Sequence, residues 1–385
     1  MSDAQLVAEA ENAPCSICGV SDVKEDIIGD VIPTPDKSFA TTTRLAPSAA
    51  ALRAPALALP PMVSEMGLAN VQRVMRMSYE ERAALASNGM ARMLLSVIAL
   101  KKTNLCLSAD VTTTSELITL ARACGPHIAM LKTHADIIDD FSVDTSRQLR
   151  EIAQEFGFVL LEDRKIADIG NTSVMQVRGG VHRIASWAHA ITAHSISGVG
   201  VLEGIQLGFQ QGAAERAAML VRPAASQGHD YQRAGTMVRT MDREHGVFLL
   251  AQMSSAGNLI DDAYTRQTVA MAQANPIVCG FIAQERLVGR CTDAVGSGEG
   301  CGRACGGVCG AGLLIATPGV QVATVGRRFD GDKLHQQYNT PRNAILRGSD
   351  VIIVGRGIIQ ANDPTEMAER YREEGWRAYL ERTGQ

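Results

Sequence analysis

Short runs of aliphatic residues recur along the chain from residue 104 onward, and segments with helical periodicity, such as Thr114–Cys124 and Thr145–Phe156, separate most of them. Continuous apolar runs that alternate with helices are typical of parallel strands covered on both faces. Eight such units in about 280 residues predict a (β/α)8 TIM barrel. A doubly wound sheet is the competing fold, but eight regular repeats fit it less well. The expected strands are Asn104–Ala109, Ile128–Lys132, Phe158–Glu162, Ala190–Ala193, Val247–Ala251, Ile277–Ile282, Leu313–Thr317 and Val351–Val354.

The segment before the first strand, residues 66–103, is predicted to be a helical lead-in. Ser78 and Glu81 have the spacing of a capping box, and we expect regular structure to begin near Ser78. Asn88-Gly89 interrupts the helix that follows. An apolar stripe with helical spacing then predicts a helix packed on a core, through Met90, Met93, Leu94, Val97 and Ile98.

Residues 1–65 are predicted to form a low-complexity, disordered N-terminal extension. Residues 40–62 are rich in Ala and contain four prolines, which break helices while the alanines bury little surface. Cys15 and Cys18 form a lone C-x-x-C, for which ordinary thiols are a better interpretation than a zinc site.

The barrel domain is expected over residues 104–385, with insertions at about 209–245 and 291–312. The second insertion is rich in Gly and places Cys301, Cys305 and Cys309 four residues apart. We interpret it as a flexible surface insertion, because metal ligands ordinarily have other spacings.

The overall composition is that of a globular protein, with 46% hydrophobic and 20% charged residues, which excludes global disorder. The net charge of -4 gives no reason to expect a nucleic-acid or membrane partner. Nine cysteines, an odd number, favour a reducing compartment. The N-terminus lacks a basic segment and an apolar core, so we expect a cytoplasmic protein.

Charged residues follow several of the expected strands, at the end where TIM barrels carry their chemistry. Asp110 follows the first strand, Lys132 ends the second, and Asp163, Lys165 and Asp168 follow the third. Alternation along the strand places Asp163 and Lys165 on one side. Neighbouring opposite charges favour the charged forms of both groups, so an ammonium in this array can donate a proton to a developing carbanion. A ring of structural salt bridges is the alternative.

The last two strands carry a second signal. Gly319 follows the seventh strand and Gly355-Arg356-Gly357 follows the eighth, where TIM barrels often bind phosphate. Glycines allow backbone N–H groups to approach a phosphate, and Arg356 offers a bidentate fork.

These features resemble the orotidine 5'-phosphate decarboxylase family, particularly its eukaryotic form. The resemblance covers about residues 78–382 and is carried by NLCLSADV (104–111), MLKTHADI (130–137), LLEDRKIADIGNT (160–172), GFIAQ (280–284), ATPGV (316–320), HQQY (335–338) and VIIVGRGI (351–358). It implies decarboxylation of orotidine 5'-monophosphate to uridine 5'-monophosphate, the last step of de novo pyrimidine synthesis. It also implies no metal or organic cofactor and a homodimer with shared active sites.

The resemblance also implies a role for each matching residue. Lys165 would protonate C6, Asp163 would lie against the substrate carboxylate, and Lys132 would link Asp163 to the ribose. Asp168 and Thr172 would reach the active site of the partner subunit. The remaining substrate-binding positions would be Asp110, Ser254, Pro318, Gln336, Tyr338, Gly355 and Arg356, while His134 and His194 are expected to be supporting or core residues.

Some features depart from the family pattern. Ser255-Ala256-Gly257 stands where the family usually has a lysine beside the glycine. The residues before Asn104 are too few for the phosphoribosyltransferase of bifunctional members, which indicates a monofunctional enzyme. Two other functions stay open: a related barrel that acts on a sugar phosphate through a divalent metal, and a non-catalytic interaction protein.

Overall fold

The computed structural model describes residues 65–219, 229–287, 310–322 and 338–385, which belong to one compact unit, Leu59–Gln385. The predicted N-terminal extension lies outside the described residues, apart from Glu65. Most of the predicted insertion at 291–312, including its cysteines, also lies outside them.

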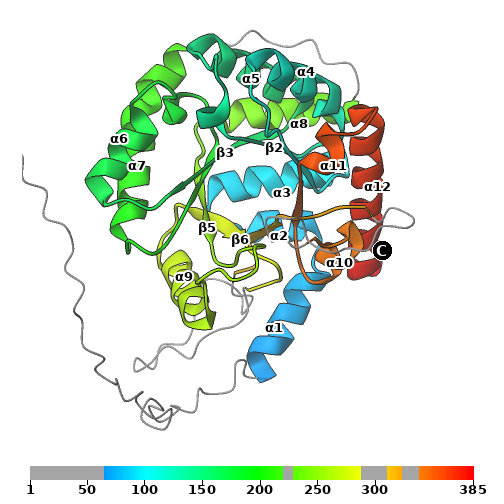
Figure 1. Cartoon of the computed structure of the whole chain (residues 1–385). Coiled ribbons are helices and arrows are strands. Elements are labelled where there is room, and N and C mark those ends of the chain that lie inside the picture. The colour runs from blue at the N-terminus through cyan, green and yellow to red at the C-terminus, as the bar shows by residue number, and fades with distance from the viewer. Residues whose placement is uncertain (1–64, 220–228, 288–309, 323–337) are drawn as a thin grey trace, which may run out of the picture. The chain divides into compact units, whose positions relative to one another are not determined.

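In the described part of the chain, eight parallel strands form a closed barrel in the order β1 to β8, and β8 pairs with β1 (Figure 1). The predicted barrel is therefore confirmed, and the doubly wound alternative is excluded. The strands are β1 (Leu105–Ser108), β2 (Met130–Thr133), β3 (Val159–Ile166), β4 (Ala190–Ala193), β5 (Gly246–Leu250), β6 (Val278–Ile282), β7 (Leu314–Thr317) and β8 (Val351–Val354).

Each aliphatic run predicted to be a strand lies in the barrel. The runs are continuously apolar because side chains on both faces of these strands are buried. Strand β3 differs. It continues to Ile166, beyond the predicted end at Glu162, and its residues from Asp163 to Lys165 are only partly buried. This extension carries the charged motif into the mouth of the barrel.

Helices surround the barrel (Figure 1). Their first turns are capped by side chains where the sequence offers Ser, Thr or Asp, as at Thr113, Ser142 and Asp261. The segment 209–245 contains the end of α7 and all of α8. The helices are α4 (Thr114–Cys124), α5 (Val143–Phe156), α6 (Gly170–Arg178), α7 (Gly200–Ala218), α8 (His229–Thr240), α9 (Asp262–Ala274), α10 (Pro341–Leu346), α11 (Arg356–Ile359) and α12 (Pro364–Thr383), with short 3-10 turns η1 (Gly125–His127), η2 (Ala135–Ile137) and η3 (Ile184–Ser186).

Three helices precede the barrel: α1 (Glu65–Arg76), α2 (Tyr79–Leu85) and α3 (Gly89–Lys101). The expectation that regular structure begins near Ser78 is wrong, because α1 starts at Glu65. Val74 of α1 is buried against Ala311, and no local sequence pattern predicts this tertiary contact. The capping box itself is confirmed, since the Glu81 amide donates to Ser78 Oγ at 3.1 Å and the Ser78 amide donates to Glu81 Oε2 at 2.7 Å.

Helix α3 packs at the N-terminal end of the barrel. Its apolar stripe is fully buried, as predicted. Asn88, the residue that caps α3, donates from Nδ2 to the carbonyls of His245 and Pro276, just before β5 and β6 begin. Among the described residues, no helix is both long and apolar enough to cross a membrane.

Candidate active site

A cavity of about 290 Å³ opens at the C-terminal ends of the strands. Side chains from several strands reach it, because the carboxyl ends of parallel barrel strands meet at one mouth. The residues predicted from sequence that line it are Asp110, Lys132, Asp163, Lys165, Ser254, Pro318, Tyr338, Gly355 and Arg356.

The acids and lysines form a connected array inside this cavity. Asp163 Oδ2 lies 3.0 Å from Lys132 Nζ and 2.9 Å from Lys165 Nζ. Lys132 Nζ is in turn 3.5 Å from Asp110 Oδ1. Asp163 and Lys132 are largely buried, whereas the Lys165 side chain is 39% exposed. Lys165 is thus the lysine of this array that is most accessible to a molecule in the cavity.

A bulge in β3 directs Lys165 into the array. The pairing of β3 with β4 shifts register between Glu162 and Ile166, and Lys165 adopts a positive φ of 50°. Bulges re-aim side chains next to active sites, and a left-handed conformation outside glycine costs about 1–3 kcal/mol. Thr192 of β4 supports this conformation, because its Oγ1 accepts a hydrogen bond from the Lys165 amide at 2.9 Å and donates to Asp163 Oδ1 at 2.7 Å.

Electrostatic coupling fixes the charges of the two buried members. Burial opposes ionisation of Asp163, but its contact with His134 and the charges of Lys132 and Lys165 hold its pKa well below the usual range. Burial likewise opposes the charge of Lys132, but Asp163 and Asp110 raise its pKa above the ordinary value. The array therefore keeps this carboxylate ionised and this lysine protonated.

His134, which was expected to be a supporting or core residue, contacts both buried members of the array. Its Nε2 lies 2.9 Å from Lys132 Nζ and 3.3 Å from Asp163 Oδ2. The backbone after His134 is held by Glu162, whose Oε1 accepts a hydrogen bond from the Ala135 amide at 3.0 Å. Glu162 Oε2 also accepts from Thr133 Oγ1 at 2.6 Å, and burial raises the pKa of Glu162 to about 7.

The opposite wall of the cavity is built by the segments that follow β7 and β8. The Arg356 guanidinium donates to the hydroxyl of Tyr338 and lies 5.7 Å from the centre of that ring. Gly357 is required by close packing, since a Cβ there would lie 2.3 Å from the hydroxyl of Tyr371. That hydroxyl accepts a hydrogen bond from the Val322 amide at 2.9 Å, which ties the segment after β7 to α12.

Two of the described residues predicted for the site, Asp168 and Thr172, do not line this cavity. Asp168 is exposed, and its Oδ1 accepts a hydrogen bond from the neighbouring Ile169 amide at 2.7 Å. Thr172 lies in the first turn of α6, outside the cavity lining. Gln336 lies outside the described residues.

Several residues of the site went unnoticed in the sequence. Ser108 donates from Oγ to Asp110 Oδ1 at 2.8 Å, and Gln252 lines the cavity beside Ser254. The available signal was a polar residue within or just after an apolar run, as with Ser108 in LCLS and Thr192 in AITA. No role was predicted for Glu162, and the contacts of His134 with Lys132 and Asp163 were not predicted, because these contacts join separate strands.

Comparison with known proteins agrees with this architecture. The Orotidine 5'-phosphate decarboxylase / HUMPS family matches residues 103–371. The orotidine 5'-phosphate decarboxylase of Yarrowia lipolytica is 40% identical over 78% of this chain and 98% of its own. Those of Rhizopus oryzae and Magnusiomyces magnusii are 40% and 42% identical, each over 79% of this chain and 96% of their own. The chain therefore belongs to the orotidine 5'-phosphate decarboxylase / HUMPS family.

Proposed function

We propose that the protein decarboxylates orotidine 5'-monophosphate to uridine 5'-monophosphate, with Lys165 as the proton donor and without a metal or organic cofactor. The observation that carries the proposal is the accessible Lys165 ammonium, 2.9 Å from the buried, ionised Asp163. Family membership and the names of the relatives support the choice of substrate.

In the proposed reaction, the bond between C6 and the carboxylate carbon breaks and carbon dioxide leaves. The electron pair stays on C6, and a proton from Lys165 Nζ forms the new C–H bond. Asp163 lies against the departing carboxylate, so that like charges disfavour the ground state. Lys132 keeps Asp163 ionised and reaches the ribose, while Asp110 accepts a hydrogen bond from a ribose hydroxyl.

The phosphate is assigned to the wall formed after β7 and β8. Arg356 supplies the positive charge, Tyr338 a hydroxyl, and the Gly355 backbone a close approach. Pro318 and Gln336 are proposed to complete the substrate contacts, and Ser254 to contact the pyrimidine. Binding energy from this remote phosphate then helps to place C6 beside Lys165.

Substrate turnover is the direct test of this function. Absorbance in the ultraviolet should change when the protein is mixed with orotidine 5'-monophosphate, and the rate should be unaffected by a chelator. Within the described residues, no three His, Cys, Asp or Glu side chains are grouped as metal ligands. Absence of turnover by folded protein would refute the function, and loss of turnover in chelator would contradict a reaction without a metal.

We further propose that the enzyme is a homodimer in which Asp168 and Thr172 enter the partner's active site. Both residues lie outside the cavity of their own chain, and apolar Ile169 and Met175 beside them are 66% and 58% exposed. Such exposed apolar side chains favour a protein interface at this surface.

Mixed dimers of Lys165→Ala and Asp168→Ala chains test this arrangement. Each variant alone should be nearly inactive, but a mixed dimer has one intact site, so random pairing should restore about one quarter of wild-type activity. Mixed dimers, verified by differently tagged chains, would be assayed for turnover. Failure of verified mixed dimers to regain activity would contradict the shared site.

A further inference from the structure

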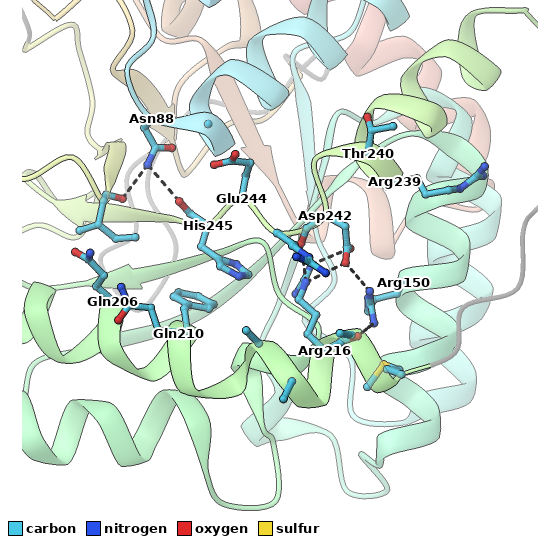
Figure 2. Close-up of a pocket in the computed structure, with 18 of the residues that line it drawn as sticks. Asn88, Arg150, Gln206, Gln210, Arg216, Arg239, Thr240, Asp242, Glu244 and His245 are labelled. Carbon is cyan, nitrogen blue, oxygen red and sulfur yellow. Dashed lines mark hydrogen bonds and ion pairs between the residues drawn. The ribbon is translucent and has the colours of Figure 1, made fainter.

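A second and larger cavity, of about 1040 Å³, lies at the N-terminal end of the barrel, opposite the charged array. Figure 2 shows side chains that line it. We call it the basal cavity. Its walls come from α5, α7, the segment between α8 and β5, and the start of α3. The catalytic chemistry of TIM barrels sits at the other end, so this cavity has no part in the proposed reaction.

The floor of the basal cavity contains two buried arginines on one carboxylate. Arg216 Nη2 lies 3.0 Å from Asp242 Oδ1, and Arg150 Nη2 lies 2.6 Å from Asp242 Oδ2. The arginine side chains are 2% and 4% exposed. Arg150 Nε is buried without a hydrogen-bond partner.

His189 does not supply a further charge to this group. Its Nδ1 accepts a hydrogen bond from the Leu160 amide at 3.1 Å, and burial lowers its pKa to about 4. Two guanidiniums thus face one carboxylate, which leaves one positive charge in excess. The C-terminal end of α7 offsets part of this charge, since Arg216 lies in its last turn. A buried charge without a full counter-charge is costly, so an anion in the cavity would be stabilising.

Two more arginines line the cavity at its exposed edge, Arg239 and Arg243. Neither has an ion pair within the part of the chain that the structure describes. Glu244 does not neutralise them, because its carboxylate lies over the start of α3, where a Cβ on Gly89 would meet Oε2 at 1.9 Å. The partial positive charge at the N-terminus of α3 therefore balances the charge of Glu244. Four arginines against two carboxylates leave the lining positively charged.

The other side of the cavity presents neutral hydrogen-bonding groups. Gln206 and Gln210, one turn apart on α7, point toward the cavity beside His245 (Figure 2). The His245 ring stacks on Phe209, with centroids 4.1 Å apart. Its Nδ1 is buried without a partner, and burial lowers its pKa to about 3, so that the neutral ring can accept a hydrogen bond from a ligand.

From this arrangement we propose that the basal cavity is a second, non-catalytic site for a nucleoside monophosphate. The phosphate would lie against the exposed Arg239 and Arg243, which line the cavity together with the buried Arg150 and Arg216. The base or sugar would lie toward Gln206, Gln210 and His245, which provide amide donors and acceptors and an imidazole acceptor. The volume suits a ligand much larger than a bare phosphate.

Titration calorimetry with adenosine 5'-monophosphate, cytidine 5'-monophosphate and inorganic phosphate tests the proposal on the full chain. The wild type should bind at least one of the two nucleotides more tightly than phosphate. The double variant R239A/R243A should weaken nucleotide binding about tenfold or more, because two charge-assisted contacts are lost. Both side chains are exposed, so we expect the fold and the turnover of orotidine 5'-monophosphate to be unchanged.

Two further variants separate the parts of the site. Gln206→Ala with Gln210→Ala should weaken nucleotide binding but leave phosphate binding unchanged. Arg356→Ala, in the catalytic cavity, should leave binding at the basal cavity intact. Nucleotide binding lost in Arg356→Ala but retained in R239A/R243A would place it in the catalytic cavity and overturn the proposal. So would the absence of binding to wild-type protein, or equal affinity for phosphate and nucleotides.

Discussion

Replacement of Lys165 by alanine should lower the turnover of orotidine 5'-monophosphate by between about 10² and 10⁴-fold, the range that a lost general acid ordinarily costs. The reason is geometric: Lys165 is the accessible ammonium of the array, and Thr192 and the β3 bulge hold its backbone in a left-handed conformation. Asp163 keeps its contacts with Lys132 and His134 in the variant, so the rest of the array retains its charges.

Ligand binding distinguishes a lost proton donor from a collapsed site. The product, uridine 5'-monophosphate, should still bind Lys165→Ala within about tenfold of wild type, because Arg356 and Tyr338, which we propose bind the phosphate, are unchanged. Single-turnover kinetics and calorimetry would measure the two effects. Lys165→Arg is the matched variant: it keeps a positive charge beside Asp163, but a guanidinium does not give up its proton in proteins. Wild-type turnover by either variant would contradict the role of Lys165.

Replacement of Asp350 by asparagine should lower the free energy of unfolding by about 3–5 kcal/mol, the usual cost of removing one partner from a buried ion pair. Asp350 precedes β8 and is fully buried. Arg286 Nη2 donates to its Oδ1 and Oδ2 at 2.8 Å each, and Arg82 Nη2 donates to Oδ2 at 2.9 Å. Arg382 Nη2 lies 3.7 Å from Oδ1. Asparagine would leave these buried guanidiniums without their carboxylate.

This loss should depend on pH in a defined direction. Burial opposes ionisation of Asp350, but Arg286 and Arg82 hold its pKa well below the usual range. A carboxylate whose pKa is lowered in the folded state stabilises that state at pH values above its pKa in the unfolded chain, which is about 3.9. This contribution to the free energy of unfolding decreases as the pH falls below that value. The difference between wild type and Asp350→Asn should therefore be full at neutral pH and shrink below about pH 4.

Urea unfolding at several pH values measures this difference. Glu381→Gln is the matched control, since it removes one carboxylate from an ion pair with Arg342 in which both side chains are about half exposed. An exposed pair should change the stability by no more than about 1 kcal/mol. A neutral-pH loss in Asp350→Asn as small as that of the control would show that the cluster does not stabilise the fold as proposed.

The barrel could be predicted from the sequence because its signal is local. Each strand is buried on both faces, so each appears as a continuous aliphatic run, and the capping box at Ser78 is likewise a short-range pattern. The charged array was also predictable in part. Asp163 and Lys165 are two residues apart on one strand, and Asp110 and Lys132 stand at strand ends that a barrel brings together.

Contacts between segments distant in the chain could not be predicted from local sequence patterns. The sequence around Val74 does not predict its contact with Ala311. The sequence around Arg82 does not predict its ion pair with Asp350, 268 residues later in the chain. The same holds for two residues from the strands beside β3. His134 follows β2 and Thr192 lies in β4, and both contact Asp163 only when the sheet forms. Register between strands, which local composition does not encode, decides these pairs.

The sequence by itself thus determined the strands, their order around a barrel, and the acids and lysines at its mouth. Tertiary structure decided which of these residues meet. It brought Asp110, Lys132, Asp163 and Lys165 into one cavity but left Asp168 and Thr172 outside it. It also placed the arginines of the basal cavity together from three separate segments. Burial and charge pairing act through space, so their effects become visible only once the closed barrel sets the distances.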